Sequence, residues 1–134
     1  MTIRGDAAHQ SLRILYAEDD RQILACTAEL LHHHGHEVNC ATDGSQALLK
    51  LIRDQNAFDV LITDQQMPHL DGLGLVEQSR RAGYRGRIVV FASALSESDR
   101  RSFTRLAVDA IVEKGSRAQT LLETLHRLSR SQAA

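Results

Sequence analysis

The sequence predicts an α/β fold in which a doubly wound, five-stranded parallel sheet lies between two layers of helices. Short apolar segments alternate with longer amphipathic ones five times along the 134 residues. Strands that alternate with helices over short connections form parallel sheets, because a parallel neighbour needs a crossover connection. Segments 58–63 and 87–92 are almost wholly apolar, which is typical of strands that helices cover on both faces.

The elements are predicted from hydrophobic spacing and from capping residues. Strands are expected at 12–17, 36–41, 58–63, 87–92 and 109–114. Helices are expected from Asp20 to a stop at Gly35, from the cap Asp43, over 71–83 and 96–108, and over 116–131 with Ser116 as cap. The inward faces are expected to carry Ile23, Thr27, Leu30, Leu31 and His34, then Ala47, Leu48, Leu51 and Ile52, then Phe103 and Leu106, and finally Leu121, Leu122, Leu125 and Leu128.

The composition is that of a single globular domain. Apolar residues make up 43% of the chain and charged residues 25%, and the formal net charge is −1. This charge does not favour a nucleic-acid surface or a membrane anchor, and no apolar run approaches the ~20 residues of a membrane span. Residues 1–10 are polar and predict a disordered tail. Cys26 and Cys40, without a secretion signal, fit a reducing cytoplasm, and their apolar neighbours predict buried or half-buried thiols.

Polar side chains stand where the predicted strands end, which is the edge where doubly wound sheets bind ligands. They are Glu18, Asp19 and Asp20 after the first strand, Asp64 after the third, Ser93 after the fourth and Lys114 after the fifth. If the first and third strands are neighbours, their carboxylates meet. Two such charges ~4 Å apart repel by about 4 kcal/mol at an effective dielectric of ~20. An all-oxygen cluster of this kind predicts a hard cation, Mg²⁺ above all.

Asp64 is the residue that most needs explaining. Taken alone, it is best interpreted as a turn residue that ends a strand. Beside a metal, an ammonium and a hydroxyl, its carboxylate is arranged to receive a phosphoryl group and to form an acyl phosphate. The sequence therefore favours Asp64 as a phosphoacceptor.

The same residues carry a family resemblance. The segments "ILYAEDD", "LITDQQMPHLDG", "VVFASA" and "AIVEKG", in this order and at these intervals, resemble the receiver domains of two-component response regulators. The resemblance covers roughly Leu12 to Leu128. It implies a flavodoxin-like sheet with strand order 2-1-3-4-5, a receiver domain over 11–131, and no output domain after it in this chain.

The resemblance also assigns roles. It implies that Asp64 is phosphorylated, that Glu18, Asp19, Asp64 and the backbone carbonyl of Gln66 bind Mg²⁺, that Ser93 is the switch hydroxyl and that Lys114 binds the phosphoryl group. The implied donor is a phosphohistidine on a histidine kinase or a phosphotransfer protein. The domain would promote only its own phosphorylation and dephosphorylation. It would signal in the cytoplasm by protein contact, without binding nucleic acid or membrane. Its fourth helix, fifth strand and fifth helix would form a face for homodimerisation.

Three residues depart from the family pattern. Gly115 stands where a proline usually follows the lysine, so the loop that carries Lys114 is expected to be trans or mobile. Ile111 replaces the aromatic switch residue of the family, which predicts weakened signalling through the face formed by the fourth helix and the fifth strand. Glu113 is a possible competitor for Lys114.

Other functions remain as alternatives. The chain is compatible with an interaction module that works without phosphorylation, or with a receiver cut from a larger regulator or hybrid kinase. A hydrolase using an aspartyl phosphate is disfavoured, since Gln66 stands where its second acid belongs. A flavin site is disfavoured by the acids after the first strand. The "HHHGH" segment from His32 to His36 is interpreted as a solvated helix end instead of a transition-metal site.

Overall fold

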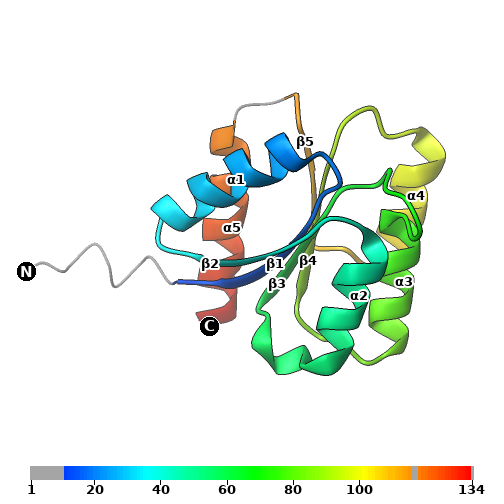
Figure 1. Ribbon diagram of the computed structural model, residues 1–134, viewed down its shortest axis with the longest axis horizontal. Coiled ribbons are helices and arrows are strands. Elements are labelled where there is room, and N and C mark those ends of the chain that lie inside the picture. The colour runs from blue at the N-terminus through cyan, green and yellow to red at the C-terminus, as the bar shows by residue number, and fades with distance from the viewer. Residues whose placement is uncertain (1–10, 116–117, 134) are drawn as a thin grey trace, which may run out of the picture.

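The computed structural model describes residues 11–115 and 118–133, with side chains to residue 130. Five parallel strands form one sheet in the order β2-β1-β3-β4-β5 (Figure 1). The strands are β1 (Arg13–Ala17), β2 (Glu37–Ala41), β3 (Val60–Thr63), β4 (Arg87–Ala92) and β5 (Ala110–Glu113). The predicted fold class and strand order are confirmed.

Helices cover both faces of the sheet. They are α1 (Arg21–His33), α2 (Gly44–Arg53), α3 (Gly72–Arg81), α4 (Glu97–Arg105) and α5 (Ala118–Ala133), with a short 3-10 turn, η2, at Gln55–Ala57. Figure 1 shows α1 and α5 on one face and α2, α3 and α4 on the other. None of the helices in the described part of the chain is long and apolar enough to cross a membrane.

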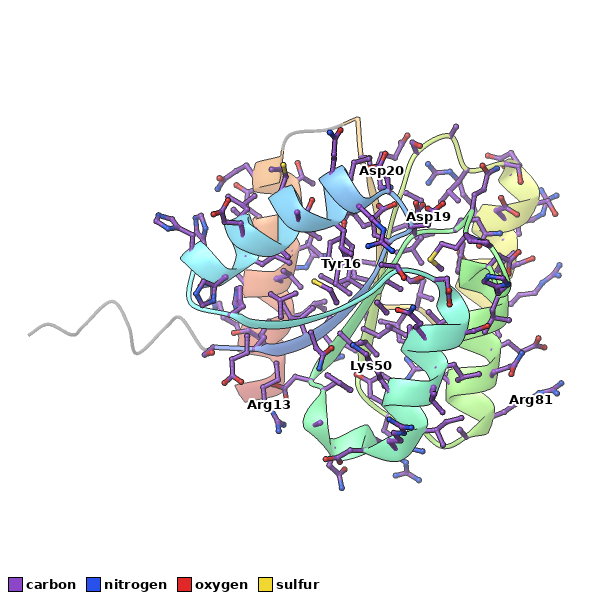
Figure 2. All side chains as sticks on the ribbon, in the orientation of Figure 1. Arg13, Tyr16, Asp19, Asp20, Lys50 and Arg81 are labelled. Carbon is purple, nitrogen blue, oxygen red and sulfur yellow. The ribbon has the colours of Figure 1, made fainter. Side chains whose placement is uncertain are left out.

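Each face of the sheet has its own apolar core, as alternating side chains of a strand require. Tyr16 (labelled in Figure 2) and Ile62 belong to the core on the α1 and α5 side, which also contains Leu31 and Leu125. Leu61 belongs to the other core, with side chains from α2, α3 and α4. Strands β1, β3 and β4 are buried almost throughout, which is why their sequences show no polar alternation.

Four helices begin at side-chain caps beside the carboxyl ends of the strands. Asp20 caps α1, Asp43 caps α2, Asp71 caps α3 and Ser96 caps α4, each accepting a hydrogen bond from a backbone N–H of the first turn. Such caps satisfy donors that a helix leaves unpaired. The capping role predicted for Asp43 is therefore seen, and Asp20 and Ser96 cap α1 and α4 in the same way.

Several burial predictions were wrong. The inner face of α1 is centred on Leu24 and Leu31, and His34 is exposed, because the helix is rotated slightly from the predicted stripe. Ile52 of α2 is 52% exposed, since the stripe of that helix is narrower than predicted. Cys26 of α1 is exposed, while Cys40 is half-buried as expected. His36, which was expected to belong to a solvated helix end, is buried. The predictions for residues 1–10 and for the cap Ser116 lie outside the described residues.

Candidate phosphoacceptor site

Strand pairing brings the predicted acids together. Strand β1 lies between β2 and β3, and Ala17 pairs with Thr63. Glu18 and Asp64 follow these two residues, so both leave the sheet at its carboxyl edge. The amide of Asp64 donates to the carbonyl of Ala17 at 3.0 Å, which continues the ladder one residue further. The acids are thus fixed by the register of the two central strands.

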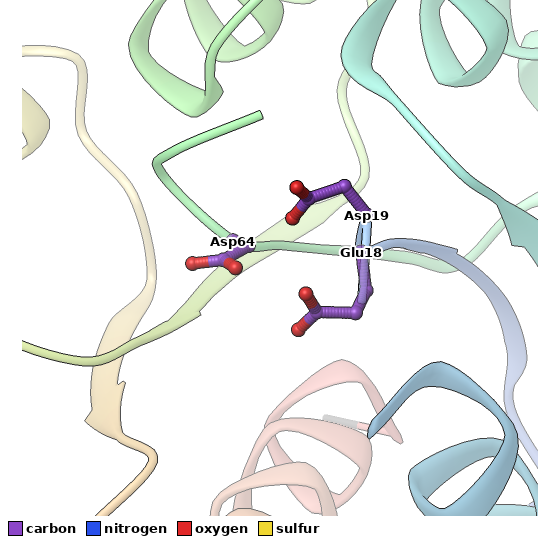
Figure 3. Close-up of side chains that lie close together, drawn as sticks. All are labelled: Glu18, Asp19 and Asp64. Carbon is purple, nitrogen blue, oxygen red and sulfur yellow. The ribbon is translucent and has the colours of Figure 1, made fainter. Parts of the chain in front are cut away.

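Glu18, Asp19 and Asp64 form one cluster (Figure 3). Each offers a carboxylate oxygen, and these oxygens lie within 4.8 Å of one another. Glu18 is buried, Asp64 is 9% exposed, and Asp19 is exposed. Three carboxylates at this spacing form an all-oxygen donor set that suits a hard divalent cation. The predicted acidic cluster is present, and it could hold a metal.

Lys114 reaches the cluster from the far side of β4. Its amide donates to the carbonyl of Ala92 at 3.0 Å, so the residue continues from β5 at the same edge. Its Nζ donates to Oδ2 of Asp64 at 2.8 Å and forms an ion pair with Glu18. Gly115 follows Lys114 in place of the usual proline, and no peptide bond in the described residues is cis. Lys114 therefore makes these contacts from a loop with trans peptide bonds.

Burial and hydrogen bonds shift the pKa values of Glu18 and Lys114 in this cluster. Burial raises the pKa of the Glu18 carboxyl, and this outweighs the hydrogen bond from Lys114 and the one from the amide of Asp20. Burial alone would lower the pKa of Lys114, but hydrogen bonds to Asp64 and Glu18 outweigh it and raise that pKa. Lys114 is therefore held as a cation. One ammonium among three carboxylates leaves excess negative charge, which favours a further cation.

Two predicted site residues lie at the rim. Ser93 follows β4 directly and is exposed, and within the described residues no hydrogen bond joins it to Asp64. Gln66, two residues after Asp64, is also exposed. Between Ser93 and α4, Ala94 has a φ of 53°, a left-handed conformation that costs a non-glycine residue about 1–2 kcal/mol.

The comparison with known sequences decides the family. The chain matches the family model described as "Response regulator receiver domain" over residues 14–126. The chain belongs to this family. The resemblance found in the four segments is confirmed.

The relatives of this receiver domain include longer regulators. It is 33% identical over 119 residues to Response regulator MprA of Mycobacterium leprae (strain TN), covering 89% of this chain and 51% of the relative. It is 32% identical over 125 residues to the Gliding motility regulatory protein of Myxococcus xanthus, covering 91% of this chain and 16% of the relative. The chain therefore spans about half the length of the first relative and less of the second.

Solved structures agree with the fold of the receiver domain. Chemotaxis response regulator CheY4 of Vibrio cholerae is similar with a TM-score of 0.78 and 27% identity, covering 88% of this chain and 98% of that one. A receiver domain protein from Methanospirillum hungatei JF-1 gives a TM-score of 0.82 at 23% identity, covering 93% and 100%, and this second likeness supports the fold alone.

The loop after β3 holds Asp64 in place by contacts that the sequence analysis missed. Oδ1 of Asp64 accepts from the amide of Gln65 at 2.7 Å. The side-chain oxygen of Gln65 accepts from the amide of Leu73 at 2.8 Å, and the backbone carbonyl of Gln65 accepts from the amide of Gly72 at 2.8 Å. A Cβ at Gly72 would lie 2.2 Å from the carbonyl oxygen of Asp64. The "LDG" end of the motif was the available signal, because a glycine there permits this close approach.

Proposed function

We propose that this receiver domain accepts a phosphoryl group on Asp64 from a phosphohistidine of a histidine kinase or phosphotransfer protein, as one Mg²⁺-dependent step of a two-component phosphorelay. The observation that carries this proposal is the cluster at the sheet edge. Asp64 stands there with two further carboxylates, and Lys114 Nζ lies 2.8 Å from its Oδ2. A nucleophile flanked by a cation and a metal site has the parts that phosphoryl transfer needs.

The metal ligands in this proposal are Glu18, Asp19, Asp64 and the backbone carbonyl of Gln66, with water completing the shell. Carboxylate, carbonyl and water oxygens are the ligands that Mg²⁺ prefers. When bound, the ion would offset the negative charge that the acids and a phosphoryl group bring together. The excess carboxylate charge around Lys114 supports this assignment, and the identity of the ion as Mg²⁺ is part of the proposal.

The transfer itself is assigned to the side chains. A carboxylate oxygen of Asp64 forms a bond to phosphorus while the phosphorus–nitrogen bond to the donor imidazole breaks, and the electron pair of that bond stays on the nitrogen. Lys114 passes from the Asp64 carboxylate to an oxygen of the phosphoryl group. Ser93 binds another of these oxygens once its loop has moved inward. The product is an acyl phosphate on Asp64.

The test is phosphorylation by a small donor. Incubation with acetyl phosphate and Mg²⁺, followed by intact-mass measurement, is expected to add one phosphoryl mass per chain. Asp64→Asn should abolish the addition, whereas the control Asp59→Asn, at the opposite end of β3, should leave it unchanged. Undiminished labelling of Asp64→Asn would refute the assignment. A wild-type chain that takes up no phosphoryl group would favour the alternative of an interaction module that works without phosphorylation.

A second measurement addresses the metal. Asp19→Ala should weaken Mg²⁺ binding, because it removes one ligand. The same change should leave the metal-free fold as stable as before or more stable, since it removes like-charge repulsion. Unchanged Mg²⁺ affinity in this variant would contradict the proposed ligand set.

The output of the domain belongs to the same proposal. Residues 11–131 would act as a phosphorylation-controlled contact module in the cytoplasm, as a free regulator or as part of a larger one, catalysing only their own phosphorylation and dephosphorylation. The contact surface would be formed by α4, β5 and α5. A homodimer would form through the same surface. An ion pair of 3.2 Å between Arg100 of α4 and Glu113 of β5 supports the treatment of these elements as one surface. Sedimentation with and without beryllofluoride tests for the dimer.

A further inference from the structure

Strand β2 lies at one edge of the sheet, and only its inner side pairs with another strand (Figure 1). The amide of Glu37 donates to the carbonyl of Leu12 at 2.9 Å, so the polar backbone groups of Glu37 point toward β1. Because these groups alternate in direction along a strand, those of Val38 and Cys40 point away from the sheet. Within the described residues, no hydrogen bond engages the amide or carbonyl of Val38 or the amide of Cys40. Such an edge is a template on which another strand can pair.

Two side chains of α2 cover part of this edge. Lys50, labelled in Figure 2, donates from Nζ to the carbonyl of Cys40 at 2.8 Å and to Oδ1 of Asn39 at 2.7 Å. Gln46, one turn earlier on the same side of the helix, accepts from the amide of Thr42 at 3.0 Å through its Oε1. The Cys40 carbonyl and the Thr42 amide are turned away from β1, so Lys50 and Gln46 occupy places that a further strand would take.

The helix dipole alone does not account for the position of Lys50. A cation in the last turn of α2 suits the dipole, but a solvated ammonium would satisfy that preference equally well. Lys50 is instead half-buried, and its ammonium binds two acceptors of β2. Arg53, in the same last turn, is exposed and makes no hydrogen bond or ion pair within the part of the chain that the structure describes. Lys50 therefore makes a specific contact with the strand.

The outer edge of β2 is complementary to a second copy of itself. If two β2 strands pair antiparallel about Asn39, Val38 of each strand lies opposite Cys40 of the other. Since the amides and carbonyls of these two residues point outward, each such pair can exchange both of its hydrogen bonds. Glu37 then lies opposite Ala41, so no like charges of the two strands meet.

We propose that the outer edge of β2 fits β2 of a second copy of this chain, and that Lys50, with Gln46, keeps this edge closed. The hydrogen bond from Lys50 removes the Cys40 carbonyl as an acceptor in both pairs. Lys50 also binds Asn39, which would lie on the twofold axis, so pairing would bring two ammonium groups together. Lysines at sheet edges oppose pairing between chains in this way. This surface is separate from that of α4, β5 and α5, because β2 and β5 are opposite edges of the sheet.

The test is sedimentation of the full chain over a range of concentrations, without a phosphoryl donor. Lys50→Met removes the two hydrogen bonds and the charge but keeps a long side chain. Its mass should rise with concentration toward twice that of the monomer, and Lys50→Ala is a second variant with the same expected result. The matched control Arg53→Met, which removes a positive charge from the same helix turn, should sediment as the wild type does. Val38→Pro, added to Lys50→Met, should abolish the dimer because it removes an outward amide and no hydrogen bond to β1.

A cross-link reports the register of the two strands. The residues that face each other on the axis form a pair without mutual hydrogen bonds, with Cα atoms about 4.5 Å apart, which a disulfide can span. The native cysteines are first replaced in the Lys50→Met chain by Cys26→Ser and Cys40→Ala. In that background, Asn39→Cys should form a disulfide-linked dimer on oxidation, and the control Glu37→Cys should not.

Several results would overturn the proposal. These are Lys50→Met and Lys50→Ala chains that both stay monomeric, an Arg53→Met chain that dimerises equally, or a dimer that survives Val38→Pro or does not cross-link at position 39. Cross-linking at position 39 that is as fast with Lys50 present would show that this side chain does not close the edge. Circular dichroism checks that every variant is folded. None of these measurements depends on phosphorylation of Asp64, so this proposal and the phosphoacceptor proposal can fail separately.

Discussion

Gly72→Ala tests whether the loop after β3 fixes the position of Asp64. The added Cβ would lie 2.2 Å from the carbonyl oxygen of Asp64 and 2.9 Å from Cα of Gln65. Real Cβ atoms essentially never approach another atom within 3.0 Å, and both of these neighbours are backbone, so no side chain can simply turn away. Either the start of α3 or the backbone of Asp64 must move.

The expected size of the effect follows from this displacement. Overpacking of a close contact typically costs about 1–3 kcal/mol of folding free energy. Because a displacement of ~1 Å in a reacting group can slow a reaction by about 10²-fold, we expect phosphorylation by acetyl phosphate to slow by about 10–100-fold. The rate is measured by intact mass at saturating Mg²⁺, and the stability by urea unfolding. Circular dichroism confirms that the variant is folded under the assay conditions.

Gly115→Ala is the matched control for this prediction. It lies next to Lys114 on the other side of the site, and a Cβ there meets no atom within 4 Å. Its phosphorylation rate and stability should stay close to those of the wild type. If Gly72→Ala is labelled as fast as Gly115→Ala and unfolds at the same urea concentration, the idea that Gly72 positions Asp64 is refuted.

Three further predictions concern the rest of the domain. Burial would raise the pKa of Asp59, but hydrogen bonds from Arg13 outweigh it and lower that pKa. The stability from this pair should therefore be fully present above the ordinary pKa of aspartate and be lost as the pH falls through the lowered value, so urea unfolding of Asp59→Asn and wild type should converge at acid pH. Leu51→Ala should cost about 2–5 kcal/mol in the same assay because Leu51 is fully buried, whereas the exposed Leu49→Ala should change stability by less than about 0.5 kcal/mol. Beryllofluoride should shift the amide resonances of residues 96–111 only modestly, and large uniform shifts along α4 would show that the switch is not weakened.

The sequence was informative where one physical constraint governs a whole segment. Strands β3 and β4 are almost wholly apolar because helices cover both of their faces, so their position and the parallel sheet could be predicted. Asp64 and Lys114 could be placed because each lies at the carboxyl end of a predicted strand. The buried face of a helix was harder to predict. In α2, Leu49 and Ile52 are as apolar as Leu51, yet both are exposed while Leu51 is buried.

Relations between distant segments could not be predicted from the sequence. The reach of Lys114 depends on the register of β4 and β5, which pairs Ala92 with Glu113. The hydrogen bonds of Gln65 to the start of α3 depend on a loop conformation that the motif does not specify. The contact of Lys50 with the edge of β2 depends on how α2 packs, and the pattern of a helix carries no information about the strand beside it.

The contacts around β5 limit how strongly a movement of Lys114 could act at a distance. Lys114 is bound to the acidic cluster, and the preceding residue, Glu113, pairs with Arg100 of α4 at 3.2 Å. This ion pair is largely exposed, and such pairs contribute about 0–1 kcal/mol. An equilibrium shifts only as far as the differential contacts allow, and 1 kcal/mol corresponds to about a fivefold change. Ile111 packs in the core beside α4 but offers no hydrogen bond that would add to this coupling. A movement of Lys114 toward a phosphoryl group would therefore reach α4 mainly through Glu113 and Arg100, and it would bias that helix by a small factor.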